Sequence, residues 1–531
     1  MSNTNRYTNE FLEQLEEGGR AKAGEVGNKI HVSELTSLPA FIYEKVRNIV
    51  DYKDEYLLRK NAIKRFLKRK LLIPQFPQAP EVTALAMVRD LILSRYLPND
   101  TIHESVLPIL GKILVKYHRL FNEIGMGGCD IPRWREKIIG MAAVECDVTL
   151  VSPAERNAYA TYAYKVLKEV FDLVDLPENQ EEKNILLAVA IQRVLERADD
   201  DIIGYYLLKI YHPVWFNSEI ETAVAELAPK LTEHLNICAK YYSHRLGKRL
   251  LTQVKQLLVP FLTLRGIITN FRGPRRELFT KQSQLEHLAH DQYVNYWKAT
   301  RSRIRRKGFH ALVYIFITKM LLATLLELPY ERFVIGEIRY VPLTINLLFP
   351  VFLMLVITLL IKSPGKENEN KVVEGIMELV YGGKQGFYKV RQLKSNKRSI
   401  WRRLSYGLLY LITMGVSFGI LVYILSRLGF NPLSGALFIF FVSLVSFFGI
   451  SLRQQARQLR AIGGRETIFT FMVDFFTLPI VAFGRWLSTT FDKVNIFVFM
   501  LDFLFEMPFK TLLKIIDEWF AYLKEKKEEM Y

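Results

Sequence analysis

Two carboxylates occupy matching places in a repeated, phenylalanine-rich segment. The segments TIFTFMVDFF, from Thr467, and NIFVFMLDFL, from Asn495, share the pattern Ile-Phe-x-Phe-Met-x-Asp-Phe. The repeat places Asp474 and Asp502 among aromatic residues, and Glu506 follows the second aspartate at helical spacing. Ionisable side chains within a membrane usually line a polar path or pair with one another. These three carboxylates are therefore candidates for proton or cation chemistry.

Lys319 is the corresponding basic candidate. It lies near the middle of residues 309–328, an apolar segment whose other ionisable residues are His310 and Glu327. A cation at the bilayer centre costs about 3 kcal/mol on insertion scales, so it usually faces a partner or a cavity. The alternatives are snorkelling along the helix, and pairing or function within the membrane, including a place opposite the repeated aspartates.

The repeat itself allows two arrangements. On a helix, Asp474 shares a narrow polar stripe with Thr470 on an otherwise aromatic surface. Segments 467–483 and 494–510 are shorter than the ~20 residues that cross a bilayer, and a proline follows each aspartate. These features favour two amphipathic helices that lie in the membrane interface, with their carboxylates toward water. In the alternative, both segments span the membrane and the aspartates line a proton or cation pathway.

The bulk composition indicates two regions in different solvents. The chain has 531 residues, of which 50% are hydrophobic and 24% are charged, and its formal net charge is +18. The positive charge fits either nucleic acid or an anionic membrane surface, and its position beside apolar segments makes nucleic acid an unlikely partner. The three cysteines, Cys129, Cys146 and Cys238, have no metal or redox spacing. We expect them to be buried thiols, and we expect no cofactor.

We expect an all-α fold that begins with a cytosolic helical domain. Residues 1–79 are interpreted as a basic, partly flexible arm with one amphipathic helix, and residues 80–300 as the helical domain. Apolar residues recur in this domain at intervals of three and four, which is typical of amphipathic helices. Ser152 and Glu155 are at capping-box spacing, which predicts the start of a helix.

Four apolar segments predict a membrane domain over residues 301–465. A helix that crosses a bilayer needs ~20 apolar residues, and a buried core helix, the alternative for each segment, rarely stays free of charge for this length. The expected spans are residues 309–328, 340–361, 404–426 and 432–452, with a basic cytosolic loop at 362–403. Residues 466–531 then hold the two amphipathic helices of the repeat and a charged tail.

Basic residues beside the spans predict the orientation. The sequence RSRIRRK precedes the first span, the loop at 362–403 is basic, and arginines follow the fourth span. Because cytoplasmic flanks carry an excess of Lys and Arg, we expect both termini in the cytosol and the spans in the inner membrane. The same residues would attract anionic lipid headgroups, so the lipid bilayer is an expected partner.

Small residues in two spans are candidates for close helix packing. Gly415 and Gly419 form a G-x-x-x-G pattern in the third span, and Ser443, Ser446 and Gly449 recur at three-residue intervals in the fourth. Such residues let helix backbones approach closely in lipid. We favour packing within one bundle, and homo-oligomer formation is the alternative.

Three classes of function are compatible with these observations. The favoured one is a non-enzymatic membrane protein whose cytosolic domain binds or scaffolds a cytosolic protein partner. The second is an ion or proton channel or transporter that uses Lys319, Asp474 and Asp502. The third is a membrane-bound enzyme, although the sequence carries no phosphate-binding loop, nucleophile elbow or zinc-protease helix. His287, His290 and Asp291 lie close together in sequence, and a solvated helix face explains them better than a metal site does.

Overall fold

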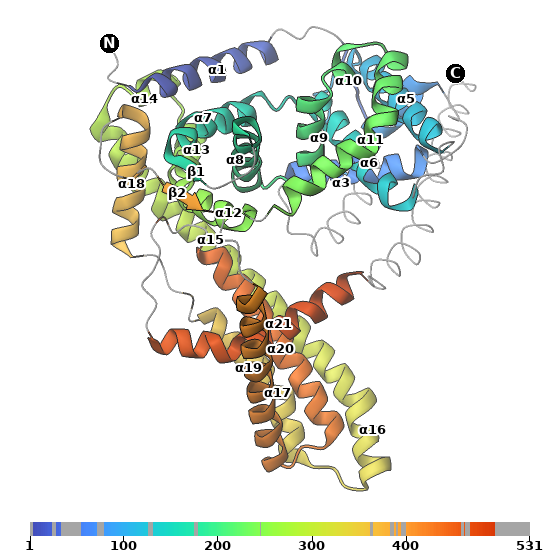
Figure 1. The fold of residues 1–531 in the computed structure, drawn as a ribbon, viewed down its shortest axis with the longest axis vertical. Coiled ribbons are helices and arrows are strands. Elements are labelled where there is room, and N and C mark those ends of the chain that lie inside the picture. The colour runs from blue at the N-terminus through green and yellow to red at the C-terminus, as the bar shows by residue number, and fades with distance from the viewer. Residues whose placement is uncertain are drawn as a thin grey trace, which may run out of the picture. The chain divides into compact units, whose positions relative to one another are not determined.

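A computed structural model shows a chain that is almost wholly helical and that divides into two compact units (Figure 1). Among the described residues, the amino-terminal unit contains Thr4–Val254 and Val390–Leu393, and the span unit contains the rest. The structure describes residues 4–23, 28–32, 55–71, 79–125, 131–174, 179–244, 246–359, 361, 365–382, 387–388, 391–394, 400–457, 461 and 468–493.

The amino-terminal unit is a set of helices around an apolar core. Its centre includes Leu67 of α3, Met87 of α4 and Leu114 of α5, all of which are buried. Polar caps fix where some helices begin: the Asn179 side chain accepts a hydrogen bond from Glu182 N at 2.8 Å at the start of α8. The helices are α1 Arg6–Ala23, α3 Glu55–Lys70, α4 Pro80–Leu93, α5 Val106–Gly125, α6 Ile131–Leu150, α7 Ala154–Val170, α8 Gln180–Leu195, α9 Asp200–Tyr211, α10 Val214–Asn217 and α11 Ile220–Tyr242.

The described parts of residues 1–79, which include α1 and α3, belong to this unit. Phe11 of α1 stacks on Tyr162 of α7 with ring centroids 4.7 Å apart. In α3, Arg59 Nε donates to Asp147 Oδ1 of α6 at 2.5 Å. Because the basic helix α3 is amphipathic, its apolar side, with Leu67, packs into the core instead of standing free.

One local expectation differs from the structure. The predicted capping box at Ser152 is wrong, because α7 begins at Ala154 with Pro153 as its N-cap and without a side-chain cap. Ser152 Oγ instead accepts a weak hydrogen bond from Ala154 N at 3.4 Å. Among the described residues, one small two-stranded sheet accompanies the helices, formed by β1 Phe171–Val174 and β2 Arg391–Lys394.

The span unit contains the long apolar helices. Its longest element is α15, which continues through two π-helical segments, η2 and η3, with one short α-helical turn between them. Figure 1 shows α15, α17, α19 and α20 running through the same bundle. The elements are α13 Val259–Asn270, α14 Arg275–Leu278, α15 Gln282–Leu322, η2 Ala323–Glu327, α16 Leu328–Tyr330, η3 Glu331–Ile335, α17 Tyr340–Leu359, α18 Lys366–Tyr381, α19 Ile400–Arg427, α20 Pro432–Arg457 and α21 Ile468–Lys493, and α12 Gly247–Leu257 joins the two units in sequence.

The prediction of four helices able to cross a membrane is confirmed. Helices that are long and apolar enough cover Gln282–Ile335, Tyr340–Leu359, Leu404–Arg427 and Pro432–Arg457. Large apolar side chains are exposed along them, such as Phe352, Leu404 and Leu408. Apolar surface of this extent is unfavourable in water and favourable in lipid, so these four helices are suited to cross a membrane.

The boundary between the units comes earlier than residue 300. The Tyr381 hydroxyl of α18 donates to Phe279 O at 3.1 Å, and the Tyr388 hydroxyl donates to Leu257 O at 3.3 Å. Gly375 of α18 lies directly against Pro260 of α13. Helix α15 continues without a break from its polar half to its apolar half. The segments that pack on the polar half therefore belong to the span unit, and not to the unit that contains the helices before Val254.

The first copy of the repeat lies on α21, which packs against two spans. A methyl group on Gly484 would overlap the Ser443 carbonyl oxygen of α20, so only glycine permits this close approach. Ser417 Oγ of α19 donates to Phe476 O of α21 at 2.9 Å. The interfacial position of segment 467–483 stays a prediction, with a membrane span as the alternative. Segment 494–510 lies outside the described residues.

Candidate functional site

Six polar residues gather inside the membrane bundle, and we call them the intramembrane cluster. They come from three places in the chain: α15 with the π-helical segments that follow it, α17, and the start of α20. Short π-helical segments shift the side chains of a helix and occur often at functional sites. The six residues are Lys319, Glu327, Glu331, Asn346, Asn431 and Ser434.

Asn346 is at the centre of one half of the cluster. Lys319 Nζ donates to Asn346 Oδ1 at 2.6 Å and lies 4.5 Å from the ring centroid of Phe441. Asn346 Nδ2 donates to Glu327 Oε1 and, at 3.3 Å, to Ser434 O. The amide therefore links the ammonium of α15 to the carboxylate at the end of η2.

Asn431 is at the centre of the other half. Its Nδ2 donates to Glu331 Oε1 at 3.0 Å, and its Oδ1 accepts from Ser434 N at 2.7 Å. The second contact caps the amino terminus of α20. Arg339 N donates to the other oxygen of Glu331 at 3.1 Å, so both oxygens of this carboxylate accept hydrogen bonds.

The charged members of the cluster are almost fully buried. Lys319 and Glu327 are 1% exposed and Glu331 is 0% exposed. Within the described part of the chain, Glu327 Oε2 and Ser434 Oγ have no hydrogen-bond partner. Because buried polar atoms are nearly always paired, two unpaired oxygens beside Asn346 distinguish this half of the cluster.

The structure brings only one of the candidate ionisable residues into a described site. Lys319 contacts Asn346, and the alternative that places it opposite the repeated aspartates stays a hypothesis. Asp474 lies on α21, but its side chain is outside the described residues, as are Asp502 and Glu506 entirely. Sequence reasoning missed the other five members of the cluster. The available signals were Glu327 and Asn346, two polar residues within apolar segments.

The small residues of the third and fourth spans have different surroundings. A Cβ atom on Gly449 would lie 2.7 Å from Ile357 Cδ1 of α17, so this glycine lies at a tight helix contact. Ser443 is buried at the Gly484 contact with α21, and Ser446 is half-buried. Among the described residues, nothing lies within 4 Å of a Cβ placed on Gly415 or Gly419. A packing role for that pair stays a prediction.

A pocket of about 530 Å³ lies within the amino-terminal unit, and we call it the tyrosine pocket. This volume falls in the ~300–1,000 Å³ range of small-molecule sites. Helices α3, α6, α7, α8 and α9 all contribute to its wall. The polar part of the wall includes Tyr56, Tyr164, Tyr205, Tyr206, Asn157, Asn184 and Gln192, and the apolar part includes Val144, Val148, Ala160, Ala188, Ile191 and Ile202.

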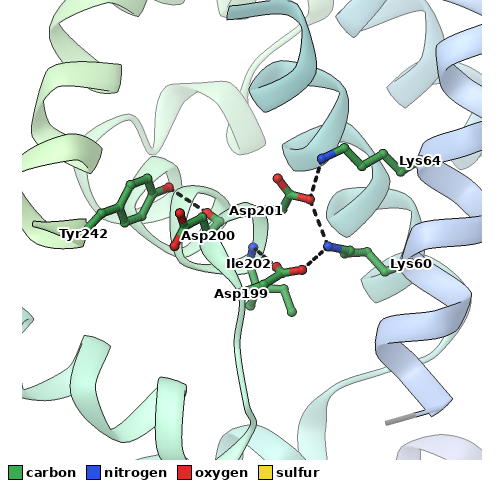
Figure 2. A network of polar contacts seen from close by, with 7 residues as sticks. All are labelled: Lys60, Lys64, Asp199, Asp200, Asp201, Ile202 and Tyr242. Carbon is green, nitrogen blue, oxygen red and sulfur yellow. Dashed lines mark hydrogen bonds and ion pairs between the residues drawn. The ribbon is translucent and has the colours of Figure 1, made fainter. Parts of the chain in front are cut away.

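An ionic clasp borders the pocket and ties α3 to the start of α9 (Figure 2). Lys60 Nζ of α3 contacts Asp199 Oδ2 and lies 2.9 Å from Asp201 Oδ2, and Lys64 Nζ lies 2.9 Å from the same atom of Asp201. Asp199 also caps α9, because its side chain accepts from Ile202 N at 3.2 Å. Lys60 is fully buried, so its ammonium needs a counter-ion, and with Lys64 the clasp contains two cations and two carboxylates.

Two further features keep the clasp in place. Burial alone would raise the pKa of Asp201, but the positive charges of Lys60 and Lys64 outweigh it and lower that pKa. A methyl group on Gly140 of α6 would overlap the Asp201 carboxylate, so the glycine makes room for it. Tyr242 donates to Asp200 O at 2.6 Å from the other side (Figure 2).

A second buried ionic group lies deeper in the same unit. Glu145 of α6 accepts from Lys116 Nζ at 2.7 Å, from the Tyr117 hydroxyl at 2.9 Å and from Trp215 Nε1 at 3.0 Å. Lys116 also donates to Trp215 O at 3.1 Å and lies 4.5 Å from the centroid of its ring. All of these side chains are buried, so this group is fully paired within the core.

The remaining histidine, aspartate and cysteine candidates from the sequence are explained by ion pairs or by burial where the structure describes them. His287 pairs with Asp291 at 3.1 Å on an exposed helix face, and His290 pairs with Glu369 of α18 at 2.9 Å. In the described part of the chain, no group of three or more His, Cys, Asp and Glu side chains could hold a metal ion. Cys146 and Cys238 are buried thiols as expected, while Cys129 lies outside the described residues. Burial raises the pKa of the Cys238 thiol to about 11.

Comparisons with known proteins give no relative: no family model matches the sequence, and no curated protein or solved structure is similar to it.

Proposed function

We propose that this protein is a membrane-anchored, non-enzymatic binding protein. In this proposal, the span unit holds the amino-terminal unit at the cytosolic face of the inner membrane, and the tyrosine pocket receives the ligand. The observation that carries the proposal is the pocket itself, a cavity of about 530 Å³ whose wall combines apolar, phenolic, amide and charged side chains. Cavities of this size and composition are the usual binding sites for small organic molecules or for inserted side chains of a partner protein.

The chemistry of the wall supports binding over catalysis. Two of its buried ions are already paired, since Lys60 contacts two aspartates and Asp147 accepts from Arg59. The phenols and amides that remain can donate and accept hydrogen bonds without an ionised nucleophile. The wall therefore suits a ligand with an apolar or aromatic body and a few hydrogen-bonding groups.

Charge beside the spans supports the proposed orientation. Arg301, Arg303 and Arg305 are exposed on α15 just before its apolar half, and Arg453 and Arg457 are exposed at the end of α20. Arginines beside the ends of spans favour the cytosolic side and attract anionic headgroups by about 1 kcal/mol each near the surface. The same flanks make the anionic lipid surface a proposed partner of the span unit.

Filling the tyrosine pocket tests the proposal. Ala188 is part of the pocket wall, so Ala188→Trp should occupy the space of the ligand. We expect native mass spectrometry of the full chain in lipid nanodiscs to show a small-molecule adduct on the wild type. The adduct should fall at least ten-fold in Ala188→Trp.

The matched control for this test is Ala225→Trp, which places the same side chain on the exposed face of α11. This variant should retain the adduct. An equal adduct on Ala188→Trp, or a wild-type protein without one, would contradict ligand binding in the pocket.

Proton or cation conduction is the second candidate function. It is supported by the intramembrane cluster, because ionisable residues buried among spans are often part of an ion pathway. The cluster differs from the path first considered, since its described members are Lys319, Glu327 and Glu331 rather than the repeated aspartates. Ion flux into liposomes that contain the purified chain would separate conduction from simple binding.

A further inference from the structure

The intramembrane cluster carries an unbalanced charge. It contains one ammonium, Lys319, and two carboxylates, Glu327 and Glu331, all at most 1% exposed. With all three ionised, the cluster has one excess negative charge in a surrounding of low dielectric constant. A buried net charge is strongly unfavourable, and a carboxyl group commonly avoids it by taking up a proton.

We propose that Glu327 is a proton-binding group inside the membrane bundle. In this step a proton from water binds Glu327 Oε2, the carboxylate becomes a neutral carboxyl group, and the net charge of the cluster changes from minus one to zero. No other bond forms or breaks. The ligand is the proton, and the site is independent of the tyrosine pocket and of whether the protein conducts ions.

Hydrogen bonding selects Glu327 over Glu331. Both oxygens of Glu331 accept hydrogen bonds, from Asn431 Nδ2 and from Arg339 N, and such contacts stabilise the ionised form. Glu327 accepts from Asn346 through Oε1 only, and its Oε2 has no partner among the described residues. A proton on Oε2 would therefore disturb no contact that the carboxylate now makes.

The charged groups around Glu327 agree with this assignment. On its own helix, the amino group of Lys319 donates to Asn346 and lies over the Phe441 ring, a place that suits a cation. Arg339, from the segment before α17, directs its guanidinium to Gly429 O at 3.0 Å, and its exposure places this charge in solvent. Helix α20 contributes the uncharged neighbours Asn431 and Ser434. Lys319 alone cannot balance both carboxylates.

A series of polar contacts links the cluster to one end of the bundle. Glu331 lies about one helical turn beyond Glu327, and Glu337 and Arg339 are exposed just past it. Ser434 Oγ, the other unpaired oxygen, lies at the neighbouring start of α20 and belongs to the same contact set through Asn346. The polar residues thus continue from the exposed end of the bundle to Lys319 near the middle of its span.

Infrared difference spectroscopy tests the assignment. The full chain in lipid nanodiscs would be compared between about pH 5 and pH 9, with attention to the C=O stretch of a protonated carboxyl group. We expect a buried carboxyl band that is absent from Glu327→Gln and retained in Glu331→Gln. The matched control Glu337→Gln, at an exposed position of the same segment, should leave the band unchanged.

Further outcomes keep the test decisive. If Glu327→Gln fails to fold, Glu327→Asp should retain the band at a shifted frequency, because it keeps the carboxyl group. Persistence of the unshifted band in Glu327→Asp, its loss in Glu331→Gln, or no carboxyl band in the wild type at any pH would overturn the proposal. A band that depends on sodium at constant pH would also overturn it, in favour of a metal cation site.

Discussion

Replacing Glu145 by alanine is expected to destabilise the amino-terminal unit by about 3–5 kcal/mol. The change would leave Lys116 as a buried ammonium without its counter-ion, and it would remove the acceptor of Tyr117 and Trp215. The cost of an unpaired buried charge dominates, because the three donors lie in the core and cannot turn to water. This is the largest effect that we expect from a single substitution in the unit.

Thiol labelling reports this effect directly. Cys146 is buried beside Glu145, and burial raises the pKa of its thiol, so it should react with a maleimide only after unfolding. In a background with Cys129→Ser and Cys238→Ser, labelling across a urea series gives the free energy of unfolding. Glu155→Ala, at an exposed position of α7, is the matched control and should change it by less than about 0.5 kcal/mol. Equal midpoints for both variants would contradict the prediction.

The second large effect is expected at the ionic clasp. Lys60→Met should cost about 3 kcal/mol, because it leaves Asp199 and Asp201 without the fully buried cation between them. Lys64→Met is the matched control. It removes one contact to Asp201 from a side chain that is partly exposed, so it should cost less than about 1 kcal/mol. The same Cys146 labelling series measures both variants, and equal costs would show that burial of Lys60 is not decisive.

The clasp also predicts the direction of a pH effect. The pKa of Asp201 is lower in the folded protein than in the unfolded chain, whose aspartates titrate near pH 3.9. Its contribution is therefore fully present above that pH and is lost as the pH falls through the folded pKa. The wild type should lose stability steeply below about pH 4, and Lys60→Met should show a shallower loss over the same range.

The sequence predicts the membrane helices better than any other part of the structure. Charge-free segments of about 20 residues leave few alternatives, so α17, α19 and α20 could be located from composition. The end of the helical domain could not, because α15 passes from its polar half to its apolar half without a break at Thr300. Contacts of α15 with α18, such as His290 with Glu369, and of α18 with Phe279 show where that polar half belongs.

Most residues of the candidate sites could not be predicted from the sequence, because they come from segments that lie far apart in the chain. Lys319 could be identified because a cation in an apolar segment is costly. Its partner Asn346 is a neutral residue on another helix, and Glu331 has the sequence surroundings of a polar loop. The tyrosine pocket depends on five helices whose mutual packing no local pattern encodes. Sequence periodicity gives the apolar side of each helix, but not which polar residues from distant segments meet.

Cysteine labelling in intact cells tests most directly that the span unit anchors the amino-terminal unit on the cytosolic side. The exposed Glu337 lies in the short connection between the first and second spans, and the exposed Arg427 is the last residue of the third span. Lys366 lies in the connection between the second and third spans. In a background without native cysteines, a membrane-impermeant maleimide should label Glu337→Cys and Arg427→Cys from outside. Lys366→Cys should react only after the membrane is opened. Labelling of Lys366→Cys in intact cells, with protection of the other two, would contradict the account.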